Sequence, residues 1–297
     1  MNYNMIFRFV KVIPAVLLGF CLFSFINDSD YENKIKEWRK ERIIELKSEQ
    51  GYLNLAGLFW LDEGRNTFGG DAANKFIFPS DRSPANLGEF ILENGKVTLV
   101  AKPDAEIYAN DQLVTKLTIF PSDQEIVLKH KTLRWFVIKR GEKYAIRLKD
   151  LDSPYLKEFK GIESFPIAEQ WKIKAKFEPT VGRKISILDV TGRLSEQESP
   201  GVLVFNVKSK EYRLDALSEG DSFFILFGDK TNKKETYGGG RFVYTSKPDA
   251  DGYVSLDFNK AYNPPCAFTP YATCPLPPKQ NILAVAVTAG EKNYGHH

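Results

Sequence analysis

Residues 171–177 read Trp-Lys-Ile-Lys-Ala-Lys-Phe, a strict alternation of apolar and basic side chains. Successive side chains of a β-strand point to opposite faces, so the four apolar residues would share one face and the three lysines the other. The pattern therefore predicts a half-buried strand. We interpret the lysine row as a solvated face or a charge-protected edge, because a nucleic-acid surface needs a wider basic field.

Short runs of the same kind recur from residue 52 to residue 289, each bounded by Gly, Pro, Asn or Asp. Residues 133–140 and 144–148 flank Gly141-Glu142 and predict a hairpin, and residues 281–288 predict the last strand. No long helical period interrupts these runs. The fold class expected is all-β, with antiparallel sandwiches or barrels.

Turn-forming residues cluster at 153–167 and predict a boundary between two β units that pack together, 52–160 and 161–297. An amphipathic helix is expected before them, at 28–51. Its apolar side chains would lie near one face, and Gly51 would end it. These side chains are Tyr31, Ile35, Trp38 and Leu46.

The N-terminal segment 1–27 reads as a targeting signal. Arg8 and Lys11 precede residues 12–26, which carry no charge. A cleaved signal peptide, a retained anchor and a lipidated Cys21 are all open interpretations. Each places the folded part outside the cytoplasm, in the periplasm or secreted, and limits membrane contact to this segment.

The charge balance argues against a nucleic-acid partner. Lys and Arg number 41 against 38 Asp and Glu, so no strong positive field surrounds the protein. Hydrophobic residues make up 43% of the chain, which is typical of a folded protein and not of a disordered one.

The first β unit resembles a forkhead-associated sandwich. The stretch 58–70, with Leu-Asp-Glu-Gly-Arg-Asn-Thr-Phe-Gly at 61–69, is similar to the family's opening pattern, and Asn110-Asp111 stands where the family has an Asn-Gly turn. Members of that family recognise phosphothreonine through an Arg that follows the Gly of the opening pattern and through a Ser-x-x-His pair. Here Gly70 follows Gly69 and the only internal histidine is His130, so phosphothreonine-peptide binding is not expected.

Longer strings resemble the bacterial and archaeal family called domain of unknown function 1684. They are Gly-Leu-Phe-Trp-Leu at 57–61, Thr-Tyr-Gly-Gly-Gly-Arg-Phe at 236–242, residues 256–267, Cys-Pro-Leu-Pro-Pro at 274–278, and Ala-Gly-Glu-Lys at 289–292. The resemblance covers the chain beyond its N-terminal segment. It implies no established activity, ligand or catalytic residue.

Several kinds of catalytic site are excluded by what the sequence lacks. A Ser-His-Asp or Cys-His site needs an internal histidine, and His130 lies in Lys-His-Lys, which reads as a solvated turn. No Gly-x-Ser-x-Gly elbow, phosphate-binding loop or dinucleotide fingerprint is present. No cofactor and no metal site are predicted, and whether the protein is an enzyme is left open.

The candidate site lies between residues 229 and 292. Three glycines before a strand would let the backbone approach a ligand closely. The guanidinium of Arg241 could bind an anion there through two hydrogen bonds. Polar side chains follow where the next predicted strand ends, and binding sites often lie at such positions. The alternative is a glycine bulge with Arg241 paired to a carboxylate such as Asp257. The predicted ligand-binding residues are Tyr237, Gly238, Gly239, Gly240, Arg241, Asp257, Asn259, Tyr262 and Asn263. Asp257 and Glu291 are the candidate acids or bases.

Residues 263–278 hold 6 of the 16 prolines and form a stiff segment. It reads equally as a wall over a pocket lined by Arg241, Asp257 and Glu291, or as a plug that closes a barrel end. Cys266 and Cys274 lie in it. A disulfide and two buried free thiols are both open, and the spacing matches no zinc pattern.

Two functions are compatible with these features. The leading hypothesis is a protein that binds, and could act on, a small polar or anionic ligand in the C-terminal β unit. The alternative is a non-catalytic structural or interaction module of the cell envelope, in which the same residues only fix loops.

Overall fold

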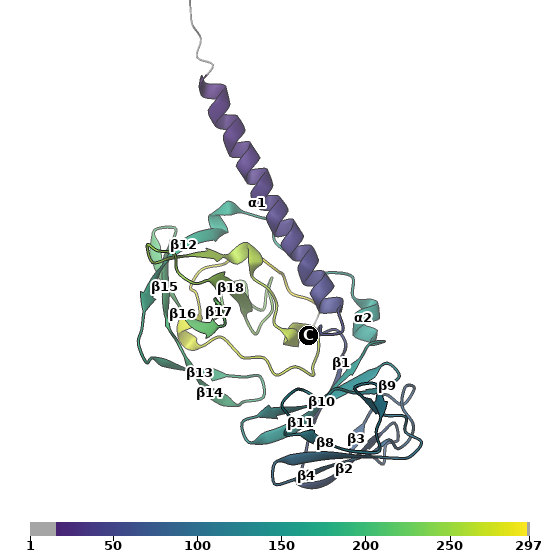
Figure 1. Ribbon diagram of the computed structural model, residues 1–297. Helices are drawn as coiled ribbons and strands as arrows, with labels where there is room; N and C mark the ends of the chain where they lie inside the picture. Colours follow the sequence, from purple (N-terminus) through teal and green to yellow (C-terminus); the bar gives the residue numbers. More distant parts are fainter. Residues whose placement is uncertain (1–15, 296–297) are drawn as a thin grey trace, which may run out of the picture.

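The computed structural model describes residues 16–295, with side chains from residue 30 onward (Figure 1). Helix α1 runs from Val16 to Lys47 and is followed by a turn in which Gly51 N–H donates to Ser48 O, 2.9 Å away. It begins earlier than the segment expected at 28–51, because no proline interrupts residues 16–47. None of the helices in residues 16–295 combines the length and the hydropathy of a membrane span.

The basic residues Arg8 and Lys11 of the predicted targeting signal lie outside the described residues.

Two sheets made from residues 55–150 enclose one apolar core. The larger has the order β1-β11-β10-β9-β6-β7, and the smaller has the order β3-β2-β4-β5-β8. All pairs are antiparallel except β2 with β3. The strands are β1 Leu55–Trp60, β2 Gly64–Gly69, β3 Phe76–Ile77, β4 Gly88–Glu93, β5 Lys96–Ala101, β6 Tyr108–Ala109, β7 Gln112–Leu113, β8 Lys116–Phe120, β9 Leu128–His130, β10 Leu133–Arg140 and β11 Lys143–Asp150.

A second, six-stranded antiparallel sheet has the order β18-β17-β16-β15-β12-β19 and encloses a separate core. Its end strands β18 and β19 lie side by side, and Thr245 Oγ1 donates to Ser255 O over 2.9 Å, so the sheet is a nearly closed barrel. The strands are β12 Lys172–Pro179, β15 Gly201–Val207, β16 Lys210–Glu219, β17 Ser222–Phe227, β18 Arg241–Ser246 and β19 Tyr253–Asp257. A separate hairpin is formed by β13 Lys184–Leu188 and β14 Leu194–Glu198.

Short helices occupy the connections: α2 Pro154–Glu158, η1 Glu169–Trp171, η2 Phe258–Lys260, η3 Pro265–Ala267 and η4 Lys279–Asn281. Figure 1 shows the C-terminal half of α1 running beside the barrel and ending where the barrel meets the first pair of sheets. The fold is thus mostly β, with antiparallel sheets in both parts.

Two sequence-based expectations about this fold were wrong. Residues 281–288 form no long strand: their backbone makes an isolated bridge between Gly228 and Ile282, and at Val287 the N–H donates to Asp229 while the carbonyl accepts from Arg241. His130 is not in a solvated turn, because it ends β9 and is buried. The lysines on either side of it led to the prediction of a solvated turn, because charged residues are usually exposed.

Candidate functional site

Arg241 is fully buried, so its guanidinium is not open to solvent as the predicted anion site requires. Its guanidinium donates to Asp229 Oδ2 at 2.9 Å and to three backbone carbonyls, those of Val287, Ala289 and Glu291. The carboxylate that pairs with it is therefore Asp229 and not Asp257. Asp229 Oδ1 also accepts from Thr231 N–H and Val287 N–H, so the ion pair fixes the barrel interior.

Asp257 and Asn259 lie at the end of β19 and hold helix α1. Tyr31 Oη donates to the Asp257 carboxylate, with both oxygens 2.9 Å away, and Asn259 Nδ2 donates back to Tyr31 Oη at 2.9 Å. The Asn259 amide also donates to Asp257 Oδ1 at 3.1 Å, and it makes two hydrogen bonds to the backbone of Ala168. These side chains fix a helix and a loop.

Glu291 and Asn263 form a second buried group against the same helix. Glu291 Oε1 accepts from Arg42 Nε at 3.3 Å, and its Oε2 accepts from the Asn263 N–H at 2.7 Å. Burial raises the pKa of Glu291, and the Arg42 charge opposes that rise. Both oxygens are engaged, so Glu291 is a structural carboxylate and not the free acid or base predicted.

The glycine segment serves packing. Gly240 has φ of +87°, and a Cβ atom there would lie 2.4 Å from Pro277 Cγ. Gly238 and Gly239 continue the turn that follows Tyr237, whose carbonyl accepts from Gly240 N–H. The proline segment therefore packs onto Gly240, next to Arg241.

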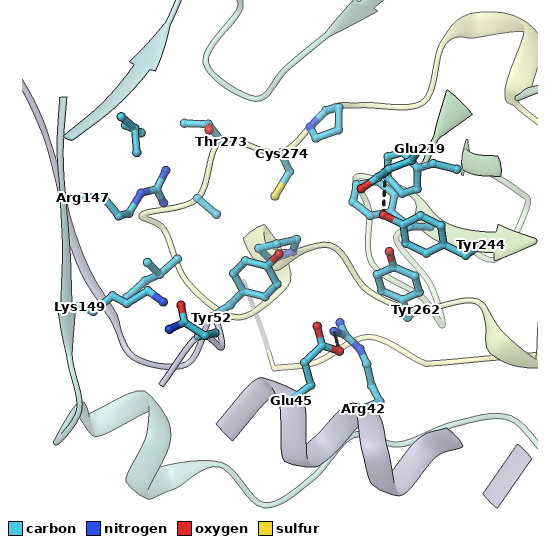
Figure 2. Close-up of a pocket in the computed structure, with 18 of the residues that line it drawn as sticks. Arg42, Glu45, Tyr52, Arg147, Lys149, Glu219, Tyr244, Tyr262, Thr273 and Cys274 are labelled. Atoms are coloured by element: carbon cyan, nitrogen blue, oxygen red, sulfur yellow. Dashed lines mark hydrogen bonds and ion pairs between the residues drawn. The ribbon is translucent and has the colours of Figure 1, made fainter. Parts of the chain in front are cut away.

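A cavity lies elsewhere, between the two parts of the molecule. This inter-unit cleft has a volume of about 950 Å³ and is bounded by β10 and β11, by β18, by residues 264–276 and by α1. Figure 2 shows Arg147 and Lys149 on one side, Tyr244 and Tyr262 on the other, and Tyr52 between them. Of the predicted ligand-binding residues, only Tyr262 lines it.

The first side of the cleft is a basic wall formed by Arg147 and Lys149. Both belong to β11, where they alternate with Ile146 and Leu148 of the core, so they lie on the opposite face of the sheet. Each is only 8% exposed. Arg147 Nη1 donates to Tyr271 O at 2.7 Å, and Lys149 Nζ donates to Glu49 O at 2.9 Å.

These two cations lack close counter-charges. Within residues 30–295, no carboxylate oxygen lies within 4.0 Å of either group, and Glu49 and Glu125 attract Lys149 only from farther away. Burial, with Arg140 nearby, lowers the pKa of Arg147 to about 10. Burial also lowers the pKa of Lys149. The wall therefore places two positive charges beside the cleft without a described carboxylate in contact with either.

The opposite side is an aromatic wall of Phe224, Tyr244 and Tyr262. Phe224 and Tyr244 stack with centroids 4.9 Å apart, and Tyr244 and Tyr262 are nearly parallel at 6.2 Å. Arg42 lies 4.6 Å from the Tyr262 centroid. Burial and the bonded Glu219 carboxylate raise the pKa of Tyr244, so its hydroxyl stays protonated and donates to Glu219 at 2.8 Å.

Residues 264–276, here called the strap, close the cleft between these walls. Cys266 and Cys274 are joined by a disulfide, with Cα atoms 6.1 Å apart. The strap bonds to the hairpin through Val190 N–H to Cys274 O and Leu276 N–H to Leu188 O, and to the first sheets through Arg147. The proline segment is thus a wall of a cavity, although the cavity is not lined by Arg241, Asp257 and Glu291 as expected.

The described lining of the cleft holds neither a histidine nor a free thiol. Its cysteine, Cys274, is joined to Cys266 in the disulfide. Over the part of the chain with described side chains, no group of three His, Cys, Asp or Glu residues has the arrangement of a metal site.

Comparisons with known proteins match mainly the second half of the chain. The profile of the family described as "Protein of unknown function (DUF1684)" matches residues 157–292. A solved structure, that of an uncharacterized protein from Haloarcula marismortui, is 31% identical over 46% of this chain and 78% of its own, with a TM-score of 0.39. Among curated proteins there is no match.

Proposed function

The chain belongs to the DUF1684 family, and we propose that it binds a small anionic molecule in the inter-unit cleft, with Arg147 and Lys149 holding the negative charge. The observation that carries the proposal is a pair of buried cations beside an open volume. A charge removed from water is unfavourable unless a counter-charge compensates it. Because no described carboxylate does so within 4.0 Å, a ligand anion is the natural partner.

The spacing of the two cations suits one shared anion. Residues at i and i+2 of a strand project from the same face about 7 Å apart along the strand. Backbone carbonyls of Tyr271 and Glu49 hold the two groups in place, but a carbonyl accepts a hydrogen bond without neutralising the charge. A carboxylate, sulfate or phosphate group between them would supply both the acceptors and the charge.

A sulfate titration followed by NMR of the backbone amides tests this proposal. The wild-type protein should show saturable shifts centred on β11, and the double variant Arg147→Met/Lys149→Met should lose them. The control is Arg65→Met, because Arg65 is an exposed basic residue on β2 away from the cleft. Unchanged sulfate shifts in the double variant, or no saturable shift in the wild type, would overturn the proposal.

We also propose an extracytoplasmic location, with residues 1–27 as signal or anchor. The disulfide supports it, because structural disulfides persist in oxidising compartments. The forkhead-associated likeness of residues 52–160 stays a prediction. The proposed function does not depend on it, and the buried His130 gives no support to phosphothreonine binding.

A further inference from the structure

The aromatic wall constrains what the anion can be attached to. Phe224, Tyr244 and Tyr262 form a row of rings, and stacking between neighbours limits their rotation. Tyr244 is 41% exposed at the cleft, although it stands in a strand and is bonded to Glu219. A fixed, exposed ring beside a cavity is a surface on which another ring can stack.

The basic and aromatic walls face each other across one volume (Figure 2). The strap, braced by its disulfide, and the end of α1 connect the two walls. A ligand that fills the cleft therefore meets cations at one end and ring faces at the other. The remaining lining is mixed: Leu55, Phe136, Ile138 and Phe242 are apolar, whereas Glu41, Glu45, Gln50 and Thr273 are polar or charged.

The stacked rings of the aromatic wall favour an aromatic ring over a sugar acid, which is also anionic and cyclic. Sugar hydroxyls need several hydrogen-bond partners when they leave water, and ring faces supply none. The Glu219 carboxylate beside these rings already accepts from Tyr244. A flexible alkyl acid would match the apolar part of the lining, but it would lose rotamer freedom that a rigid ring does not have.

Resting on the proposed function, we infer that the ligand is an aromatic carboxylic acid. Its carboxylate lies between Arg147 and Lys149, and its ring lies against Tyr244. A hydroxyl on the ring would donate to the Glu219 carboxylate. The cleft volume of about 950 Å³ is sufficient for one such molecule.

Calorimetric titration of the full chain with hydroxyphenylacetate tests this inference. We expect it to bind at least tenfold more tightly than acetate, which lacks the ring, and at least tenfold more tightly than its neutral amide, which lacks the charge. Tighter binding of glucuronate or octanoate would overturn the aromatic class in favour of a sugar acid or an alkyl acid.

Tyr244→Ala should weaken hydroxyphenylacetate binding about tenfold and leave acetate binding unchanged, because only the aromatic ligand stacks there. The matched control is Tyr108→Ala, since Tyr108 is 39% exposed on β6 and does not line the cleft. An equal loss for both ligands in Tyr244→Ala, or an equal loss in the control, would overturn the stacking role.

The two proposals fail in different ways. If acetate and sulfate bind at β11 but hydroxyphenylacetate binds no more tightly, the aromatic class is wrong and the anion site stands. If the neutral amide binds as tightly as the acid, the ring contact stands and the anion site is wrong.

Discussion

Replacing Arg147 by Met should stabilise the ligand-free protein while removing anion binding. Burial lowers the pKa of this guanidinium from its usual value to about 10. At about 1.4 kcal/mol for each tenfold change in proton affinity, the charged form loses about 3 kcal/mol on folding. The hydrogen bond to Tyr271 O, worth about 2 kcal/mol for a charged donor, offsets most of that loss.

The expected net effect is an unfolding free energy about 1 kcal/mol higher in Arg147→Met, measured by urea denaturation at pH 7. Because the folded-state pKa lies below that of the unfolded chain, the unfolding free energy rises with pH only above about pH 10, and the whole penalty is present at pH 7. Arg65→Met, at an exposed position, should change stability by less than about 0.5 kcal/mol. A loss of more than about 1 kcal/mol in Arg147→Met would show that the folded protein already compensates this charge, and the argument for a ligand anion would fail.

Other substitutions test the rest of the architecture. Asp229→Ala leaves Arg241 buried without its partner and should lower the unfolding free energy by about 3–5 kcal/mol in urea melts; a change below about 1 kcal/mol would mean the pair contributes little. Gly240→Ala forces a Cβ into a position 2.4 Å from Pro277 and a φ of +87°, so the melting temperature should fall, and an unchanged value would contradict the close packing. Reduction of Cys266–Cys274, which closes a loop of sequence separation 8, should lower stability by about 2–3 kcal/mol and weaken hydroxyphenylacetate binding; calorimetry with and without reductant measures this, and equal affinity would show that the strap holds its place unaided.

The sequence was sufficient to predict the β class and many of the strands, because period-two alternation is a local property. The hairpin of β10 and β11 around Gly141 is an example, and the strand at 171–177 is another. Patterns of this kind report which face of a strand is apolar, and they need no knowledge of distant residues.

The site could not be predicted in the same way, because its contacts join distant parts of the chain. Arg241 was expected beside Asp257, yet Asp229 pairs with it, and the carbonyls of residues 287–291 complete its shell. Arg147 and Lys149 show a visible alternation with Ile146 and Leu148. Two basic residues on the outer face of a strand are normally predicted to be exposed to solvent, however. The neighbouring sequence does not indicate that a second β unit covers that face.

The docking of α1 limits where the chain can be processed. Tyr31 bonds to Asp257, and Arg42 bonds to Glu291, so residues 31–42 satisfy two buried carboxylates of the barrel. A cut that released this stretch would remove the hydroxyl that donates to Asp257 and the guanidinium that pairs with Glu291. Any proteolytic maturation that preserves this fold must therefore fall on the N-terminal side of Tyr31.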